Sequence, residues 1–240
     1  PALMRPVALP EKGPASVQDA CPLLQAGVFH NSPKTSFLRI ITARFRSRRP
    51  HALDLTTVIA PDHPALIWAR QQDNAHIALG HVGTHLDVYE CRHIPLEAFR
   101  CPGVLADVRH TDEAGLADVD LDAIPARAFV LFRTGRIERH AYGEPAYFHD
   151  HPQLAPELID ALLARRIRFI GIDGPGIRRH AEHEQVDRHC ERHGVHVIEN
   201  LCGLGDLMPG KPFTVFTFWQ DDPQRTGLPC RVIAEQDVII

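Results

Sequence analysis

The chain has 240 residues, of which 44% are hydrophobic and 23% charged, and its formal net charge is −4 with histidine neutral. This length is enough for one large domain with a substantial buried core. The charges are mixed, with no long run of one sign, so neither a nucleic acid nor a membrane surface is an expected partner. No segment approaches the roughly 18 apolar residues of a membrane span, and the N-terminus has no apolar signal core, so we expect a cytoplasmic protein.

The numbers of cysteine and histidine residues bear on possible disulfides and metal ligands. The six cysteines form no C-x-x-C pair and are expected to be reduced, mostly buried thiols. Histidine is in excess, with sixteen copies, and many of these are expected at the surface because their neighbours are polar. The histidines in polar surroundings are His140, His149, His151, His180, His183, His189, His193 and His196.

The predicted elements follow a proline-rich start. Residues 1–50 predict an irregular N-terminal arm, and residues 51–240 a single domain. Apolar, alternating or β-branched patterns predict strands at 53–59, 76–81, 103–108, 128–132, 167–173, 195–200, 213–219 and 230–234. Helical spacing predicts one helix at 155–166 and a polar, mostly exposed one at 182–192. Strands outnumber helices, so we expect an α/β domain with a mixed sheet and flanking helices.

The segment from His81 to Asp87 is the candidate metal site. His81, His85 and Asp87 are all odd-numbered, so an extended backbone would place their side chains on one face. Two imidazoles and a carboxylate suit Zn²⁺ and would also accept Mn²⁺, Fe²⁺ or Co²⁺. Three protein ligands leave coordination positions open, as in catalytic rather than structural sites. The alternative is that these are surface histidines that happen to lie near an aspartate.

Six short motifs, in order over about residues 52–236, carry a family resemblance. The segment His81-Val-Gly-Thr-His85-Leu-Asp87 resembles the H-x-G-T-H-x-D core of the metal-dependent cyclase family, which includes bacterial kynurenine formamidase and isatin hydrolase. The other five are Leu53-Asp54-Leu55-Thr56, Val130-Leu131-Phe132-Arg133-Thr134-Gly135, Phe169-Ile170-Gly171-Ile172-Asp173-Gly174-Pro175, Val197-Ile198-Glu199-Asn200-Leu201 and Gly227-Leu228-Pro229-Cys230-Arg231.

The resemblance implies a swivelling β/β/α fold, a homo-oligomer (a dimer or a tetramer) and a divalent metal, with Zn²⁺ or Mn²⁺ expected first. By position it makes His81, His85 and Asp87 metal ligands, and Glu199 the later carboxylate that helps to hold a second ion in two-metal members. Those members have a histidine twelve residues before that glutamate, where this chain has Asp187. Asp187 remains a candidate ligand, but we favour one ion over two.

The chain departs from the family where the motif continues as D-x-P-x-H, because Tyr89 replaces the proline and Cys91 replaces the acid/base histidine. Cys91 has three interpretations: a nucleophile, a soft metal ligand or an inert buried thiol. Glu90 and His93 are near enough in sequence to serve as the base instead. Aromatic residues such as Tyr89 and Trp219 are candidates for the wall of a small-molecule pocket, with core packing as the alternative.

The function that we expect from the sequence is a metal-dependent hydrolase or cyclase. It would act on a small amide, lactam or related carbonyl compound through metal-activated water, breaking C–N bonds other than peptide bonds. The alternative is a catalytically altered or inactive homologue that binds a metal or a small ligand without turnover.

Overall fold

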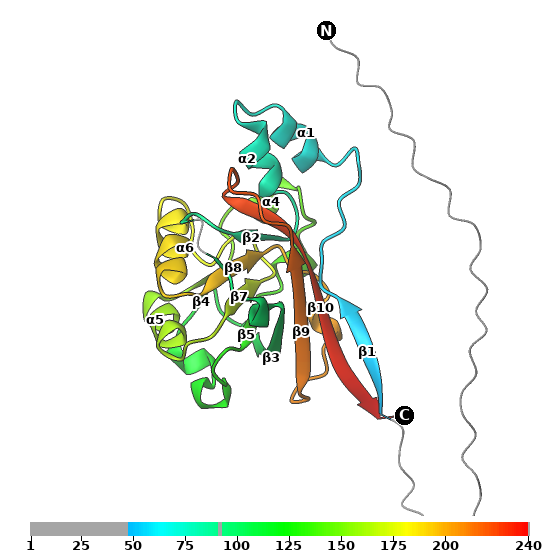
Figure 1. Ribbon diagram of the computed structural model, residues 1–240, viewed down its shortest axis with the longest axis vertical. Helices are drawn as coiled ribbons and strands as arrows, with labels where there is room; N and C mark the ends of the chain where they lie inside the picture. Colours follow the sequence, from blue (N-terminus) through cyan, green and yellow to red (C-terminus); the bar gives the residue numbers. More distant parts are fainter. Residues whose placement is uncertain (1–47, 91–92, 240) are drawn as a thin grey trace, which may run out of the picture. The chain divides into compact units, whose positions relative to one another are not determined.

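An eight-stranded mixed sheet forms the centre of the protein, seen in a computed structural model that describes residues 48–90 and 93–239 (Figure 1). Its strands are β1 (Arg48–Asp54), β2 (His85–Asp87), β3 (Arg100–Asp107), β5 (Phe129–Arg133), β7 (Phe169–Ile172), β8 (His196–Glu199), β9 (Phe213–Trp219) and β10 (Gly227–Ile239). A second, two-stranded sheet pairs β4 (Glu113–Ala114) with β6 (Gln153–Leu154). Residues 1–47 of the predicted arm at 1–50 lie outside the described residues.

The large sheet closes on itself. Its order is β1-β10-β2-β8-β7-β5-β3-β9, and β9 at the end of this order pairs again with β10. Strands β3, β5, β7 and β8 run parallel, whereas β2, β9 and β10 pair with their neighbours in antiparallel fashion. This mixed sheet with flanking helices confirms the predicted fold class.

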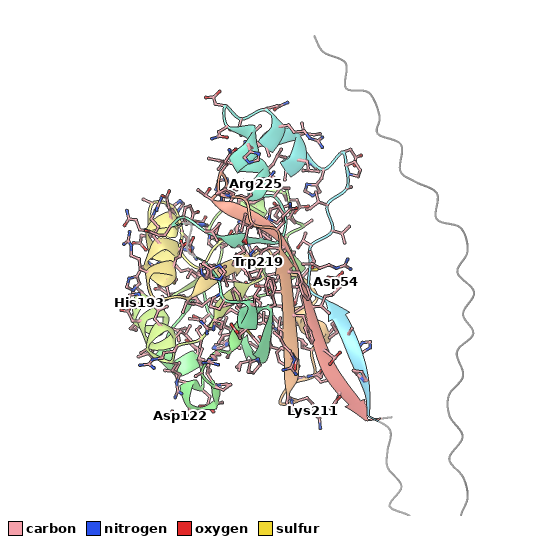
Figure 2. All side chains as sticks on the ribbon, viewed as in Figure 1. Asp54, Asp122, His193, Lys211, Trp219 and Arg225 are labelled. Carbon is pink, nitrogen blue, oxygen red and sulfur yellow. The ribbon has the colours of Figure 1, made fainter. Side chains whose placement is uncertain are left out.

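Two cores lie on the two faces of the closed sheet. Alternate residues of β5 face opposite sides: Val130 and Phe132 belong to the core under the helices, and Phe129 and Leu131 to the core inside the sheet. Because both faces are buried, the strand reads as an uninterrupted apolar run rather than an alternating one. Trp219, labelled in Figure 2, packs inside the sheet with its ring 4.5 Å from that of Phe99, so for this residue the core interpretation holds.

The helices α5 and α6 cover the outer core (Figure 1). The α-helices are α1 (Pro64–Arg70), α2 (Ala75–Gly80), α3 (Arg136–Arg139), α4 (Pro145–Phe148), α5 (Pro156–Ala164) and α6 (Glu182–Arg192). The short 3-10 turns are η1 (Leu96–Phe99), η2 (Leu116–Asp118), η3 (Leu121–Ala123) and η4 (Leu204–Asp206). None of the helices within the described ranges is long and apolar enough to cross a membrane.

Two predicted strands are wrong. Residues 76–81 belong largely to helix α2, because Asn74 caps its N-terminus by accepting the N–H of Ile77 at 3.3 Å. The strand predicted at 53–59 is β1, which ends at Asp54, where the Asp54 carboxylate accepts the N–H of Thr56 at 3.2 Å and turns the chain. The four cysteines within the described residues agree with the prediction, since Cys101, Cys190 and Cys230 are free and buried and Cys202 is free and half-buried. Cys21 and Cys91 lie outside the described residues.

Candidate metal centre

His81, His85 and Asp87 come together as predicted, with one potential ligand atom from each lying within 4.8 Å of the others. His81 Nδ1 is 3.1 Å from His85 Nε2 and 3.2 Å from Asp87 Oδ1, and His85 Nε2 is 3.5 Å from the same oxygen. Ligands bound about 2.0–2.1 Å from a tetrahedral ion are about 3.3 Å apart. These separations therefore match those of a cation's ligands.

The backbone reaches this arrangement in a different way from that expected. His85 and Asp87 share one face of β2, but His81 is the C-cap residue of α2 and is not in a strand. Gly83 makes the turn between the helix and the strand with φ of +76°, a conformation that disfavours residues with a Cβ. Gly227 leaves room for the His81 ring, because a Cβ at position 227 would lie 2.7 Å from His81 Nδ1.

A hydrogen-bond network fixes the His85 ring. Its Nδ1 donates to the carbonyl of Gly83 at 2.8 Å, so its Nε2 keeps a lone pair facing Asp87. The Asn200 amide donates to the same carbonyl at 3.0 Å and accepts the Tyr147 hydroxyl at 2.8 Å. Tyr142 holds the other side of the turn, where its hydroxyl accepts the Gly83 N–H at 2.8 Å.

A second group of ligands adjoins the first and shares Asp87 with it. It consists of Asp87, His183, Asp187 and Glu199, again with one potential ligand atom from each within 4.8 Å of the others. His183 Nε2 is 3.2 Å from Asp187 Oδ2 and 3.1 Å from Glu199 Oε1. Helix α6 supplies His183 and Asp187 one turn apart, and β8 supplies Glu199 beside β2.

Five carboxylate oxygens of these two groups are buried without a hydrogen bond. Both oxygens of Asp87, both of Asp187 and Oε1 of Glu199 are inaccessible to solvent and have no hydrogen-bond partner. Buried polar atoms are almost always paired, because leaving a charge unpaired costs several kcal/mol. The donor set of imidazoles and carboxylates therefore fits divalent cations, which would neutralise these charges.

The pKa values of the three carboxyl groups in the protein without cations agree with a cation site. Burial, followed by the charge of Asp87, raises the pKa of both Asp187 and Glu199 well above their ordinary values. Burial alone would also raise the pKa of Asp87, but the neighbouring His85 and His81 lower it instead. In the second group, Asp187 and Glu199 both pair with the imidazole of His183, and Glu199 also lies 3.6 Å from His85 Nε2.

The sequence of this chain matches a known protein family. Residues 53–179 match the model of the family described as "Putative cyclase". The chain belongs to this cyclase family. No curated protein matches the sequence.

Several solved structures share the fold. An isatin hydrolase A from Labrenzia aggregata, bound to benzyl benzoate, is 23% identical with a TM-score of 0.61, over 78% of this chain and 93% of that one. An isatin hydrolase bound to the product analogue thioisatinate is 19% identical with a TM-score of 0.64, over 79% and 93%. A "predicted metal-dependent hydrolase" from Bacillus stearothermophilus is 23% identical with a TM-score of 0.58, over 78% and 98%.

Of the three candidates for the acid/base role, Glu90 and His93 contact residues other than the ligands, and Cys91 is not among the described residues. Cys91, at the family's acid/base position, lies outside the described residues. The Glu90 carboxylate pairs with Arg192 at 3.0 Å and with Arg188 at 3.5 Å, on the side of α6. His93 is exposed and lines a separate cavity of about 240 Å³.

His183 is the ligand candidate that sequence reasoning missed, because it was placed among the surface histidines. It is half-buried, and His151 and His196 from the same set are buried. The pKa of His151 falls to about 4, mainly through burial. The i, i+4 spacing of His183 and Asp187 on a predicted helix was the available signal, since it puts both side chains on one face.

Proposed function

We propose that this member of the cyclase family is a divalent-metal-dependent hydrolase or cyclase that acts on a small amide, lactam or related carbonyl compound. The observation that carries the proposal is the set of five buried carboxylate oxygens without hydrogen bonds, placed beside the imidazoles of His81, His85 and His183. A purely structural cluster of this kind would be strongly destabilising.

The number of ions follows from charge. Asp87, Asp187 and Glu199 together carry three negative charges when ionised, and one divalent cation would leave one of them uncompensated. The sequence favoured one ion because Asp187 stands where a histidine was expected, but His183 brings an imidazole to the same group. We therefore propose two ions that share Asp87, with Zn²⁺ or Mn²⁺ as the first candidates.

The residues around the ions have distinct roles in this proposal. A bound divalent cation supplies Lewis-acid polarisation of a carbonyl group and of water. The Gly83 carbonyl and Asn200 orient the His85 ring. The Thr226 hydroxyl lies 2.9 Å from His81 Nε2 and orients the His81 ring. In both rings the other nitrogen then faces the first ligand group. The candidates for proton transfer to the leaving group are Cys91, Glu90 and His93, as the sequence indicates.

Elemental analysis of the untagged protein tests the site first. We expect about two equivalents of zinc or manganese, and a large loss in a His81→Ala/His85→Ala variant. The matched control is His110→Ala/His189→Ala, which removes two exposed histidines that pair with surface aspartates. No metal in the wild type, even after incubation with Zn²⁺ or Mn²⁺, would contradict the proposal.

Turnover tests the reaction. The metal-loaded protein should hydrolyse isatin, a lactam, or N-formylkynurenine, a formamide, and lose this activity with a chelator. Full metal loading without turnover of either compound would favour the alternative, an altered or inactive homologue that binds a metal or small ligand.

The proposed assembly is a homo-oligomer, a dimer or a tetramer. Helix α1 exposes Ile67 and Trp68, with 47% and 58% of their surfaces accessible, and such side chains are commonly buried at interfaces. Light scattering during size-exclusion chromatography tests this, and a mass of one chain would contradict it.

A further inference from the structure

Tyr89 follows the metal strand β2 by two residues and lies against the first ligand group. Its ring is 6.3 Å from the His81 ring, with 29° between the two planes. The Arg188 guanidinium lies 5.1 Å from the centre of the Tyr89 ring, within the range of a cation–π contact. The tyrosine is thus placed between a candidate ligand and the helix that carries the second group.

The backbone at Tyr89 is attached to that helix. The N–H groups of Tyr89 and Glu90 both donate to the same oxygen of Glu191, each at 2.8 Å. Glu191 is buried, and Arg188 donates to the Tyr89 carbonyl at 3.3 Å. Because Glu191 lies one turn after Asp187 on α6, these bonds hold Tyr89 in a fixed position relative to both ligand groups.

Within the described ranges, the Tyr89 hydroxyl has no hydrogen-bond partner, unlike the other two tyrosine hydroxyls. The chain has three tyrosines. The Tyr142 hydroxyl accepts the Gly83 N–H, and the Tyr147 hydroxyl donates to Asn200. Among residues 48–90 and 93–239, none forms a hydrogen bond with the hydroxyl of Tyr89.

We propose that the Tyr89 hydroxyl donates a hydrogen bond to the carbonyl oxygen of a substrate bound at the metal centre. A phenol keeps its proton near neutral pH and is both a donor and an acceptor. A donor held by several contacts before the substrate arrives does not have to be ordered when it binds. This inference rests on the proposed function and adds to it a residue that contacts the substrate.

A Tyr89→Phe variant tests the hydroxyl while it keeps the ring that packs against His81. With isatin or N-formylkynurenine, whichever the wild type turns over, kcat should fall by about 100-fold, as for the loss of one oxyanion donor, with KM little changed. Affinity for thioisatinate, measured by calorimetry on the metal-loaded protein, should weaken by about 10-fold. Metal content and Tm should stay at the wild-type values.

Tyr147→Phe is the comparison for a hydroxyl with a structural role, because this hydroxyl donates to Asn200 in the network that fixes His85. It should lower the Tm and weaken metal binding, which Tyr89→Phe should not do. Wild-type kcat and wild-type thioisatinate affinity in Tyr89→Phe would overturn the inference and leave the proposed function standing. Loss of metal from Tyr89→Phe would also overturn it, since the tyrosine would then serve the site and not the substrate. A wild type that turns over neither compound would refute both proposals.

Discussion

His183 lies one helical turn before Asp187 on α6, and its Nε2 is 3.2 Å from Asp187 Oδ2. The pair meets Glu199 from β8, so a helix and a strand that are separate in the sequence form one face of the metal centre. This relationship is the reason for expecting a second cation.

The His183→Ala variant should keep one ion and lose the other. Asp87, His81 and His85 remain as a complete first group, whereas the second group would consist of carboxylates alone. Elemental analysis after dialysis should give about one equivalent against two for the wild type. His189→Ala is the control on the same helix, because its ring pairs with Asp160 at 2.9 Å and not with the ligands. Equal metal content in His183→Ala and the wild type would argue against a second site.

The Asn200→Asp variant should weaken metal binding without removing a ligand. Asn200 donates to the Gly83 carbonyl that also accepts His85 Nδ1–H, and a carboxylate at this position would repel that carbonyl. Loss of such an outer partner typically costs about 10- to 100-fold in metal affinity. Competition with a chromophoric chelator measures the change.

Asn200→Gly gives a second test at the same residue. Asn200 has φ of +57°, which glycine adopts without strain, so this variant removes the amide while easing the backbone. Both variants should therefore bind metal more weakly, and a wild-type affinity in either would show that the amide does not orient His85.

The metal-free protein should become less stable as the pH rises. The folded-state pKa values of Asp187 and Glu199 lie well above the ordinary 3.8 and 4.5, through burial first and the charge of Asp87 second. Groups with a raised folded pKa stabilise the protein fully below their unfolded pKa, and this contribution is lost as pH rises through the folded value. Asp87 acts in the opposite direction, but its lowered pKa affects only the acid range. His151 and His183, whose pKa values burial lowers, also act in the opposite direction, but only below the ordinary histidine pKa of 6.5.

Thermal unfolding of chelator-treated and metal-loaded protein, over about pH 7 to 8.5, measures this difference. The metal-free Tm should fall with rising pH. The loaded protein should show the reverse, because protons compete with the cations for the same carboxylates and imidazoles. A metal-free Tm that rises over this range would contradict the placement of Asp187 and Glu199.

Asp173→Ala should destabilise the fold without removing a candidate metal ligand. The buried Asp173 carboxylate accepts the N–H of Thr134 at 2.8 Å, the Thr134 hydroxyl at 2.6 Å and the N–H of Gly135 at 2.8 Å. Leaving these donors unpaired should cost about 3–5 kcal/mol. Asp173→Asn keeps one acceptor oxygen and should cost less, which urea unfolding of both variants measures. An alanine variant within about 1 kcal/mol of wild type would contradict this assignment.

The chain by itself determined the parts of the molecule that depend on local pattern. Strands β5, β7, β8 and β9 and helices α5 and α6 follow from apolar runs, alternation and helical spacing, which short-range geometry enforces. The grouping of His81, His85 and Asp87 is also determined locally, because one turn at Gly83 can bring together ligands that lie within seven residues.

Only the tertiary structure decided the rest. Helix α2, predicted as a strand, is an exception, because its capping residue Asn74 is a local signal that the sequence also carries. His183 and Glu191 read as surface residues in a polar helix, yet the packing of α6 beside β2 and β8 turns them toward Asp87 and the backbone of Tyr89. Distant residues become neighbours through the order of the strands, and the periodicity of one segment carries no information on that order.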